Sequence, residues 1–275
     1  MCKVLEVSTS GYYAWLRRRP STQAQRREEI AHAVVESHKE SHGIYGYRKV
    51  HADVEAAGLF CSAEMVRRIM REKDLRARCR RRFVTTTDSQ HDRPVAPNLL
   101  ARDFTAEAPN QKWVGDITYI PTDEGWLYLA AVLDLCSRRI VGWAMSEQID
   151  AELVCEALNS GLRQRLPGRA LLHHSDRGSQ YASEAFADVL DLHGIECSMS
   201  RRGNCWDNAC MERFFCSLKT EWTNHCRYRT REEARQSIFE YIEVFYNRQR
   251  RHEALGYLSP EAFEESLEKK IQCAA

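Results

Sequence analysis

The sequence predicts an α/β protein in which helices flank a mixed β-sheet, with a helical region before the sheet and a helical segment after it. Three observations lead to this fold class. Residues 111–146 are rich in β-branched and aromatic residues, as in successive strands. Residues 150–222 alternate between amphipathic helices and short apolar strands. Residues 26–72, by contrast, show only helical periodicity.

The composition predicts a chain with a sizeable core and no membrane span. Of its 275 residues, 43% are hydrophobic and 29% are charged. The longest apolar run, residues 126–133, is far shorter than the roughly 20 residues that cross a bilayer, and the first residues do not resemble a signal peptide. Eleven cysteines at irregular spacings, without a CxxC pair, are typical of reduced thiols, so we expect a cytoplasmic protein.

The net charge of +1 hides an uneven distribution of charged residues. Residues 1–90 contain 18 Lys and Arg against 11 Asp and Glu, and nine of those basic residues lie between Arg67 and Arg82. A basic end on a nearly neutral protein favours a polyanionic partner for that end, although a solvated helix face has the same composition.

Three short helices are predicted in this basic region, over residues 26–38, 43–58 and 62–75, the last one capped by Ser62. Such a trio is typical of a helix-turn-helix module, whose last helix enters the major groove, although any small helical bundle has a similar pattern. The positions expected to face inward are Ile30, Val34, Val35, Met65, Ile69 and Met70. The outer face of the last helix carries Arg67, Arg68 and Arg71, which we expect to contact DNA.

The composition changes again after this region. Residues 84–110 are rich in Thr, Pro, Asp and Asn, which indicates a linker or an extended strap. We therefore predict a helix-turn-helix-like region at 1–84, a linker at 85–105, a sheet-containing core at 106–222 and a helical extension of the core at 223–275.

The core is predicted to run in the order strand, strand, strand, helix, strand, helix, strand, helix. The corresponding segments are 111–122, a hairpin over 124–146, then 150–165, 169–176, 183–193, 195–200 and 208–222. This order is that of the ribonuclease-H-like fold, a mixed sheet with helices on both faces.

Three acidic residues in this core have positions that suggest chemistry. Asp116 interrupts an apolar strand, Asp176 ends the next parallel strand, where open α/β sheets place their ligands, and Glu212 lies one turn into a helix. Asp207 or Asn208 is expected to cap that helix. Each of the three acids alone has an ordinary explanation: a partner for a lysine, an Asx turn, and an acid that complements a helix dipole, respectively.

Together, the three acids predict a metal site. In the proposed sheet the strand of Asp116 lies beside the strand that ends in Asp176, and the helix of Glu212 packs across the same edge. Three converging carboxylates repel one another and raise their pKa values unless divalent cations neutralise them. Oxygen ligands select Mg²⁺ or Mn²⁺, and two such ions about 3.5–4 Å apart serve phosphodiester chemistry.

The spacing also resembles a known family. Asp116, Asp176 and Glu212, with 35 residues between the last two, resemble the acid triad of integrase and transposase cores. Nearly the whole chain resembles the second-frame product of the IS3 family of bacterial insertion-sequence transposases. The segments that carry the resemblance are SDRGSQYAS (175–183), MSRRGNCWDNACMERFFCSLKTE (199–221), YNRQRRHEALGYLSPEAF (246–263) and GIYGYRKV (43–50).

This resemblance implies a DNA transposase in which the three acids hold two Mg²⁺ or Mn²⁺ ions. It also implies that Lys219, two helical turns after Glu212, contacts DNA; the alternative is a surface lysine paired with Glu221. The expected partners are double-stranded DNA, both the terminal repeats and the target, further copies of the chain on that DNA, and an upstream-frame protein or a frameshift fusion with it. The expected location is the bacterial cytoplasm at the nucleoid, with no membrane partner.

Two other functions stay open on the sequence alone. A non-catalytic DNA-binding regulator would use the helical region and would not need the acid triad. A ribonuclease-H-like nuclease would cut a strand without joining its 3′ end to target DNA.

Other polar groups are expected to be structural. His173 and His174 lack the GxSxG motif of a serine hydrolase, and the spacing of Cys197, Cys205, Cys210 and Cys216 matches no zinc site. We expect Asp134 to form a salt bridge with Arg138 or Arg139, and Trp206 to pack under the helix of Glu212. The basic run 248–252 is a further candidate for DNA contact.

Overall fold

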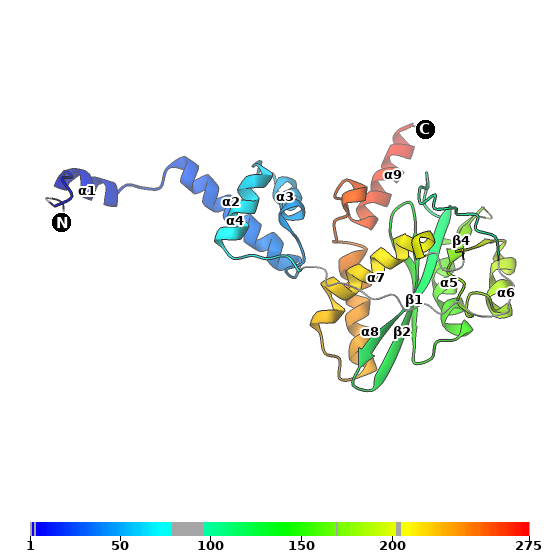
Figure 1. Cartoon of the computed structure of the whole chain (residues 1–275). Helices are drawn as coiled ribbons and strands as arrows, with labels where there is room; N and C mark the ends of the chain where they lie inside the picture. Colours follow the sequence, from blue (N-terminus) through cyan, green and yellow to red (C-terminus); the bar gives the residue numbers. More distant parts are fainter. Residues whose placement is uncertain (1, 3, 79–95, 169, 202–204, 275) are drawn as a thin grey trace. The chain divides into compact units, whose positions relative to one another are not determined.

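The structure, a computed structural model, divides into two compact units, residues 1–78 and 79–275, which are described separately. It describes residues 2, 4–78, 96–168, 170–201 and 205–274 (Figure 1). No helix in these ranges is long and apolar enough to cross a membrane. Unit 1 consists of α1 (Thr9–Leu16), α2 (Thr22–Glu40), α3 (Tyr47–Ala56) and α4 (Ala63–Glu72).

Helices α2, α3 and α4 pack around one small core. Val34, Val50 and Val66 are fully buried at its centre, and the Ser62 hydroxyl accepts the Met65 N–H at 3.2 Å, which confirms the predicted cap. Val66 takes an inward position that the sequence analysis gave to Met65.

Unit 1 differs from the prediction at three further points. Val35, expected inside, is 37% exposed. Helix α3 begins only at Tyr47, because Gly43 has a φ of +73°, outside the helical region, and Gly46 is the extended N-cap. Helix α1 was not predicted, and none of its residues is buried.

Unit 2 is built on the predicted mixed sheet. Its strands are β1 (Lys112–Thr122), β2 (Gly125–Asp134), β3 (Ile140–Ser146), β4 (Leu172–Ser175) and β5 (Glu196–Met199), in the spatial order β3-β2-β1-β4-β5. The pairs β1–β2 and β2–β3 are antiparallel, and β1–β4 and β4–β5 are parallel. The predicted neighbourhood of the first strand and the strand before Asp176 is therefore confirmed.

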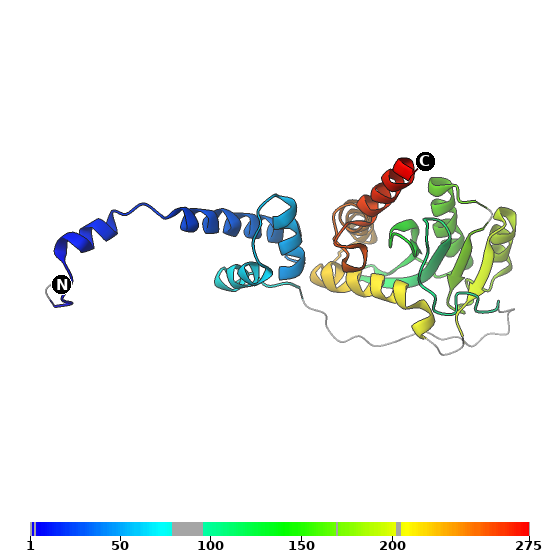
Figure 2. The same cartoon turned by 90° about the horizontal axis from the view of Figure 1, so that it is seen from above.

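Helices cover both faces of the sheet (Figure 2). They are α5 (Ala151–Arg165), α6 (Glu184–His193), α7 (Ala209–Glu221), α8 (Arg231–Phe239), which continues as a π-helical segment over Glu240–Tyr246, and α9 (Pro260–Ala274). On one face α5 and α6 pack against Trp113 and Val132. A Cβ on Gly142 in β3 would lie 2.3 Å from the Ala157 carbonyl of α5, so glycine permits this close approach.

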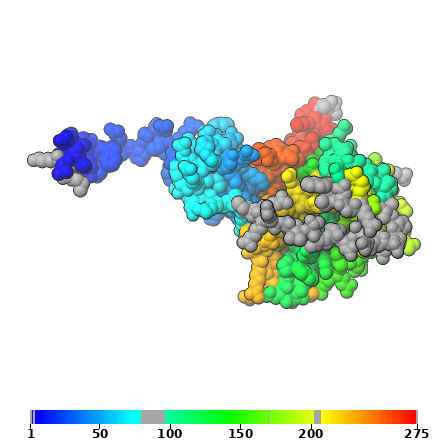
Figure 3. Space-filling model, in the orientation of Figure 1, coloured from blue at the N-terminus to red at the C-terminus, as the bar shows by residue number. Residues whose placement is uncertain are grey.

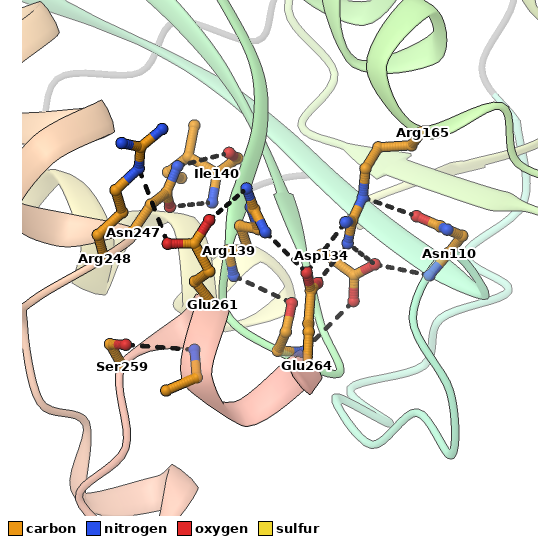
Figure 4. Close-up of polar contacts among 12 residues, drawn as sticks. Asn110, Asp134, Arg139, Ile140, Arg165, Asn247, Arg248, Ser259, Glu261 and Glu264 are labelled. Carbon is orange, nitrogen blue, oxygen red and sulfur yellow. Dashed lines mark hydrogen bonds and ion pairs between the residues drawn. The ribbon is translucent and has the colours of Figure 1, made fainter. Parts of the chain in front are cut away.

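Helix α9 is fastened to the core by ion pairs (Figure 4). Glu264 binds Arg165 and lies 3.0 Å from Arg139, and the Asn247 side chain bonds to both backbone groups of Ile140. The far end of α9, red in Figure 3, reaches the surface.

Asp134 does not have the predicted partners. Its buried carboxylate accepts the backbone N–H groups of Asn110 and Cys136 and the indole N–H of Trp113. The cation that pairs with it is Arg165, at 3.9 Å, rather than Arg138 or Arg139. A partner that distant in the sequence is supplied by the packing of α5 on the sheet.

The described part of the predicted linker runs against the core. The backbone N–H groups of Leu99 and Leu100 donate to the Ser198 hydroxyl of β5, at 3.0 and 3.2 Å, and Leu100 is buried. Residues 96–105 therefore form an extended strap on the core rather than a free linker. The boundary predicted at residue 84 falls within 79–95, outside the described residues, so the domain limits stay predictions.

Candidate active site

The candidate site lies where β1 and β4 separate. These strands pair only over Lys112–Val114, and β4 ends at Ser175. Asp116 is two residues beyond the last paired position of β1, and Asp176 follows β4 directly. The crevice beyond the carboxyl ends of parallel strands is where open α/β sheets bind ligands.

Backbone contacts orient both aspartates. Asp116 is half-buried and its Oδ1 accepts the Ile117 N–H at 2.8 Å. Asp176 Oδ1 accepts the Gly178 N–H, also at 2.8 Å. A Cβ on Gly178 would lie only 3.0 Å from that oxygen, so a side chain there would press on the carboxylate. Asp176 therefore does form an Asx turn, and this turn holds its carboxylate at the end of β4.

Helix α7 brings Glu212 to the same edge, beside β1 (Figure 1). Asn208 occupies the N-cap position, as predicted, but its side chain does not cap the helix. Instead, its Nδ2 donates to the Gly115 carbonyl at 3.1 Å. This bond ties the start of α7 to the residue before Asp116.

Asp207, the other predicted cap, has a different role. Its buried carboxylate binds Arg201 and Arg102, each at 2.9 Å, and accepts the amide N–H of Asn98. The hydrogen bonds from Arg201 hold the pKa of Asp207 well below its usual value. The acid therefore joins the strap to the segment before α7. The side chain of Trp206, which we expected to pack under α7, lies outside the described residues.

Electrostatics link the three predicted acids. Burial raises the pKa of Asp116 well above its usual value, the charges of Asp176 and Glu212 raise it further, and the charge of Lys219 lowers it. Burial also raises the pKa of Glu212, which stands on the exposed first turn of α7. The charges of Asp176 and Glu212 therefore both reach Asp116.

The three acids do not form a complete metal-coordination sphere. Over the residues that the structure describes, no three His, Cys, Asp or Glu side chains are close enough to hold a metal ion. The donor chemistry still fits a hard divalent cation, because the ligands are carboxylate oxygens and a cation would offset their repulsion.

A polar, uncharged pair lies beneath Asp116, and the sequence analysis missed it as a unit. At Gly115, an added Cβ would lie 2.9 Å from His173 Nε2 and 3.3 Å from the Tyr181 hydroxyl. Burial, and then the charges of Asp116 and Asp176, raise the pKa of Tyr181. Burial lowers the pKa of His173 to about 3, so the ring is neutral at physiological pH.

Lys219, two helical turns after Glu212 on α7, lies beside β1. Its Nζ lies 4.5 Å from the ring centroid of Tyr119 in β1. Burial lowers the pKa of Lys219 and the charge of Asp116 raises it, which places the ammonium in the field of the acids. Glu221, the alternative partner, binds Arg250 and the Tyr241 hydroxyl.

The predicted arginines of α4 are all exposed. Arg67 binds Glu64 one turn earlier at 2.8 Å, while Arg68 and Arg71 project from the same helix.

The basic run 248–252, a further candidate for DNA contact, forms several contacts within the fold. Arg250 is buried on Glu221, Arg248 lies 3.7 Å from Glu261, and Arg251 donates to the Tyr257 carbonyl. A run of like charges in the sequence does not reveal such partners.

Comparison with protein families gives three matches. The description "Integrase core domain" matches residues 106–205 and, in a second model, residues 193–260. An "HTH-like domain" matches residues 25–83. The matched ranges correspond to the sheet-containing core, its extension and the helices of unit 1.

Similar proteins span almost the whole chain. The insertion element IS600 31 kDa protein of Shigella sonnei is 45% identical over 96% of this chain and 97% of that protein. The transposase InsF of insertion sequence IS3A, from Escherichia coli K12, is 44% identical over 96% of this chain and 92% of its own length. Among solved structures, the HTLV-2 integrase catalytic core in complex with magnesium aligns with 58% of this chain and 99% of that one, at 14% identity and a TM-score of 0.46.

Proposed function

Because this chain belongs to the IS3 family of insertion-sequence transposases, we propose that Asp116, Asp176 and Glu212 are the ligands of its catalytic metal ions. The protein is a DNA transposase, a polynucleotidyl transferase with an integrase core and a helix-turn-helix-like region. One observation supports the residue assignment: the charges of Asp176 and Glu212 raise the pKa of Asp116, at the point where β1 and β4 separate.

Integrase cores depend on divalent metal, and the three carboxylates favour Mg²⁺ or Mn²⁺. We infer two ions. When bound, such a pair of ions activates the attacking oxygen and stabilises the leaving oxygen of a phosphodiester. The raised pKa of Asp116 reflects burial and the charges of Asp176 and Glu212, which the Ile117 N–H and Lys219 offset only in part.

The chain's own residues position the substrate and the ligands. Oδ1 of each aspartate is held by a backbone N–H, and Asn208 holds α7, and with it Glu212, against β1. Lys219, in the field of Asp116, is placed to bind a phosphate beside the scissile one. The nucleophiles are water for strand cleavage and then a DNA 3′-hydroxyl for strand transfer.

DNA is the partner of both units. The finer assignments are proposals: the DNA consists of terminal repeats and target, the arginines 67, 68 and 71 bind its phosphates, and several copies act together on it. We also propose that an upstream-frame protein, separate or fused, completes the active transposase, and that the protein works in the bacterial cytoplasm at the nucleoid.

The test is an acceptor assay with purified full-length protein, labelled terminal-repeat DNA, target DNA and Mg²⁺, with and without the upstream-frame protein. We expect the labelled 3′ ends to become joined to the target. Cleavage without joining would identify a nuclease, and binding without cleavage under every condition would identify a regulator; either result contradicts the proposal.

A further inference from the structure

The tip of the β1–β2 hairpin carries an exposed aromatic pair. Tyr119 is 36% exposed and Trp126 is 49% exposed, with ring centroids 5.0 Å apart in an edge-to-face arrangement. In the strand register Tyr119 lies opposite Tyr128, two residues from Trp126, so both rings stand on one face of the hairpin. Ile120 and Leu127, on the other face, are fully buried. The core therefore uses one face of this tip and leaves the aromatic face to solvent.

The tip also extends past the strands beside it. Pairing with β4 ends at Val114 on β1, and pairing with β3 begins at Tyr128 on β2. Tyr119 and Trp126 thus lie beyond the stretches of β1 and β2 that pair with β4 and β3, on the strand pair that carries Asp116.

Cationic groups accompany the aromatic pair. Lys219 Nζ lies over the Tyr119 ring, and its charge also acts on Asp116, which connects the aromatic surface to the acid site. Arg231 donates to the Trp126 carbonyl, and the side chain of Arg227, 85% exposed, pairs with Asp123 beyond the tip. Aromatic faces with neighbouring cations are the combination by which proteins hold unpaired nucleotides, through base stacking and phosphate contact.

We propose that Tyr119 and Trp126 form a stacking surface for an unpaired nucleotide of the DNA strand that enters the acid site. A paired base inside a duplex presents only its edges, so a stacking surface selects a nucleotide that has left the helix. This inference rests on the proposed function, since it assumes that DNA reaches Asp116. It adds the form of the substrate: a terminus whose last base pairs are open.

The test uses full-length protein with Glu212→Gln, so that the DNA stays uncut, and no divalent metal. Two terminal DNAs carry 2-aminopurine near the end, one fully paired and one with mismatches over its last base pairs. We expect tighter binding and stronger quenching with the mismatched DNA. Adding Trp126→Ala should weaken that binding by roughly 5- to 100-fold and change duplex binding by less than about twofold.

Two variants control for lost folding and for general aromatic contact. Trp126→Phe keeps an aromatic face and should restore most of the binding. Phe239→Ala removes a side chain that is 51% exposed and meets Trp143 edge to face, and it should behave like the parent.

Three outcomes would overturn the proposal: no preference for the mismatched DNA, an undiminished preference in Trp126→Ala, or a Trp126→Ala chain that changes its sedimentation mass but not its DNA binding. The last would make the surface a contact between copies. This assay needs neither metal nor cleavage. A stacking preference in the Glu212→Gln chain, together with a wild-type chain that does not cut DNA in Mg²⁺, would therefore contradict the proposed function and leave the stacking surface standing.

Discussion

Lys219 has its ammonium over the ring of Tyr119 and within the field of Asp116. Lys219→Ala should weaken binding to terminal DNA and reduce strand transfer, because the variant has no ammonium to bind the phosphate. Stability should change by less than about 1 kcal/mol. Filter binding measures the DNA affinity, and thermal unfolding measures the stability. Lys269→Ala, on the exposed side of α9, is the matched control. Unchanged DNA binding in Lys219→Ala would contradict the proposed direction of the helix.

Asp116 carries a charge that burial and two other acids disfavour. A carboxyl whose pKa is raised by folding makes the free energy of unfolding fall as pH rises from its unfolded value toward the folded one. Asp116→Asn should therefore stabilise the metal-free chain at neutral pH, while its amide oxygen still accepts the Ile117 N–H.

The same substitution should remove most of the stabilisation that Mg²⁺ gives the wild-type protein, since one ligand charge is gone. Thermal unfolding at neutral pH, with and without Mg²⁺, measures both effects. A variant that is less stable without metal, and responds to Mg²⁺ like wild type, would contradict this explanation.

At the scale of elements, the start of α7 depends on one side chain. Asn208 is buried and donates to the Gly115 carbonyl. Asn208→Ala leaves that carbonyl without its donor, at a cost of about 1–3 kcal/mol, and frees the helix that carries Glu212. We expect slower cleavage with all three acids intact. Asn224→Ala, an exposed asparagine of the same unit, should cut at the normal rate, and equal rates for the two variants would contradict the role.

Helix α4 is the element expected to bind DNA phosphates. Reversing Arg67, Arg68 and Arg71 to Glu should weaken binding and lower the salt slope by roughly one for each phosphate that the helix no longer neutralises. Because Arg67 is already paired with Glu64, the other two should account for most of the change. Binding measured over a range of salt concentrations tests this, and an unchanged slope would assign the helix to another partner.

Local patterns predicted most elements but not their contacts. The β-branched and aromatic composition placed β1, and helical periodicity placed α5, within about a residue of their observed ends. The separation of β1 from β4 follows from pairing between distant segments, so the positions of Tyr119 beside Lys219 and of Tyr181 beside Gly115 had no local signal. Arg250 was misjudged for the same reason, because its partner Glu221 lies 29 residues earlier.

At the scale of the whole molecule, the last helix of unit 2 depends on Glu264. Burial would raise the pKa of Glu264, but its hydrogen bond with Arg165 and the other contacts outweigh burial, and the net pKa is lowered. A lowered pKa contributes stability that is present above the unfolded value, near pH 4, and is lost as pH falls further.

Glu264→Gln removes the carboxylate that the largely buried Arg165 and Arg139 share, and leaves each arginine with a more distant acid, Asp134 at 3.9 Å and Glu261 at 3.4 Å, respectively. We expect a loss of about 3 kcal/mol at pH 7 and a smaller loss below pH 4, measured by urea unfolding. Glu268→Gln, exposed on the same helix, serves as control. If the loss of unfolding free energy is no smaller below pH 4 than at pH 7, packing rather than charge holds α9 against the core.

The most direct test of the central claim is strand transfer by three near-isosteric variants, Asp116→Asn, Asp176→Asn and Glu212→Gln, in Mg²⁺ with terminal and target DNA. Each removes one ligand charge, so each should abolish cleavage and joining while folding and DNA binding persist. Asp188→Asn, an exposed acid of α6, should act like wild type. Activity retained by one of the three would remove that residue from the site, and activity retained by two would contradict the metal-dependent mechanism.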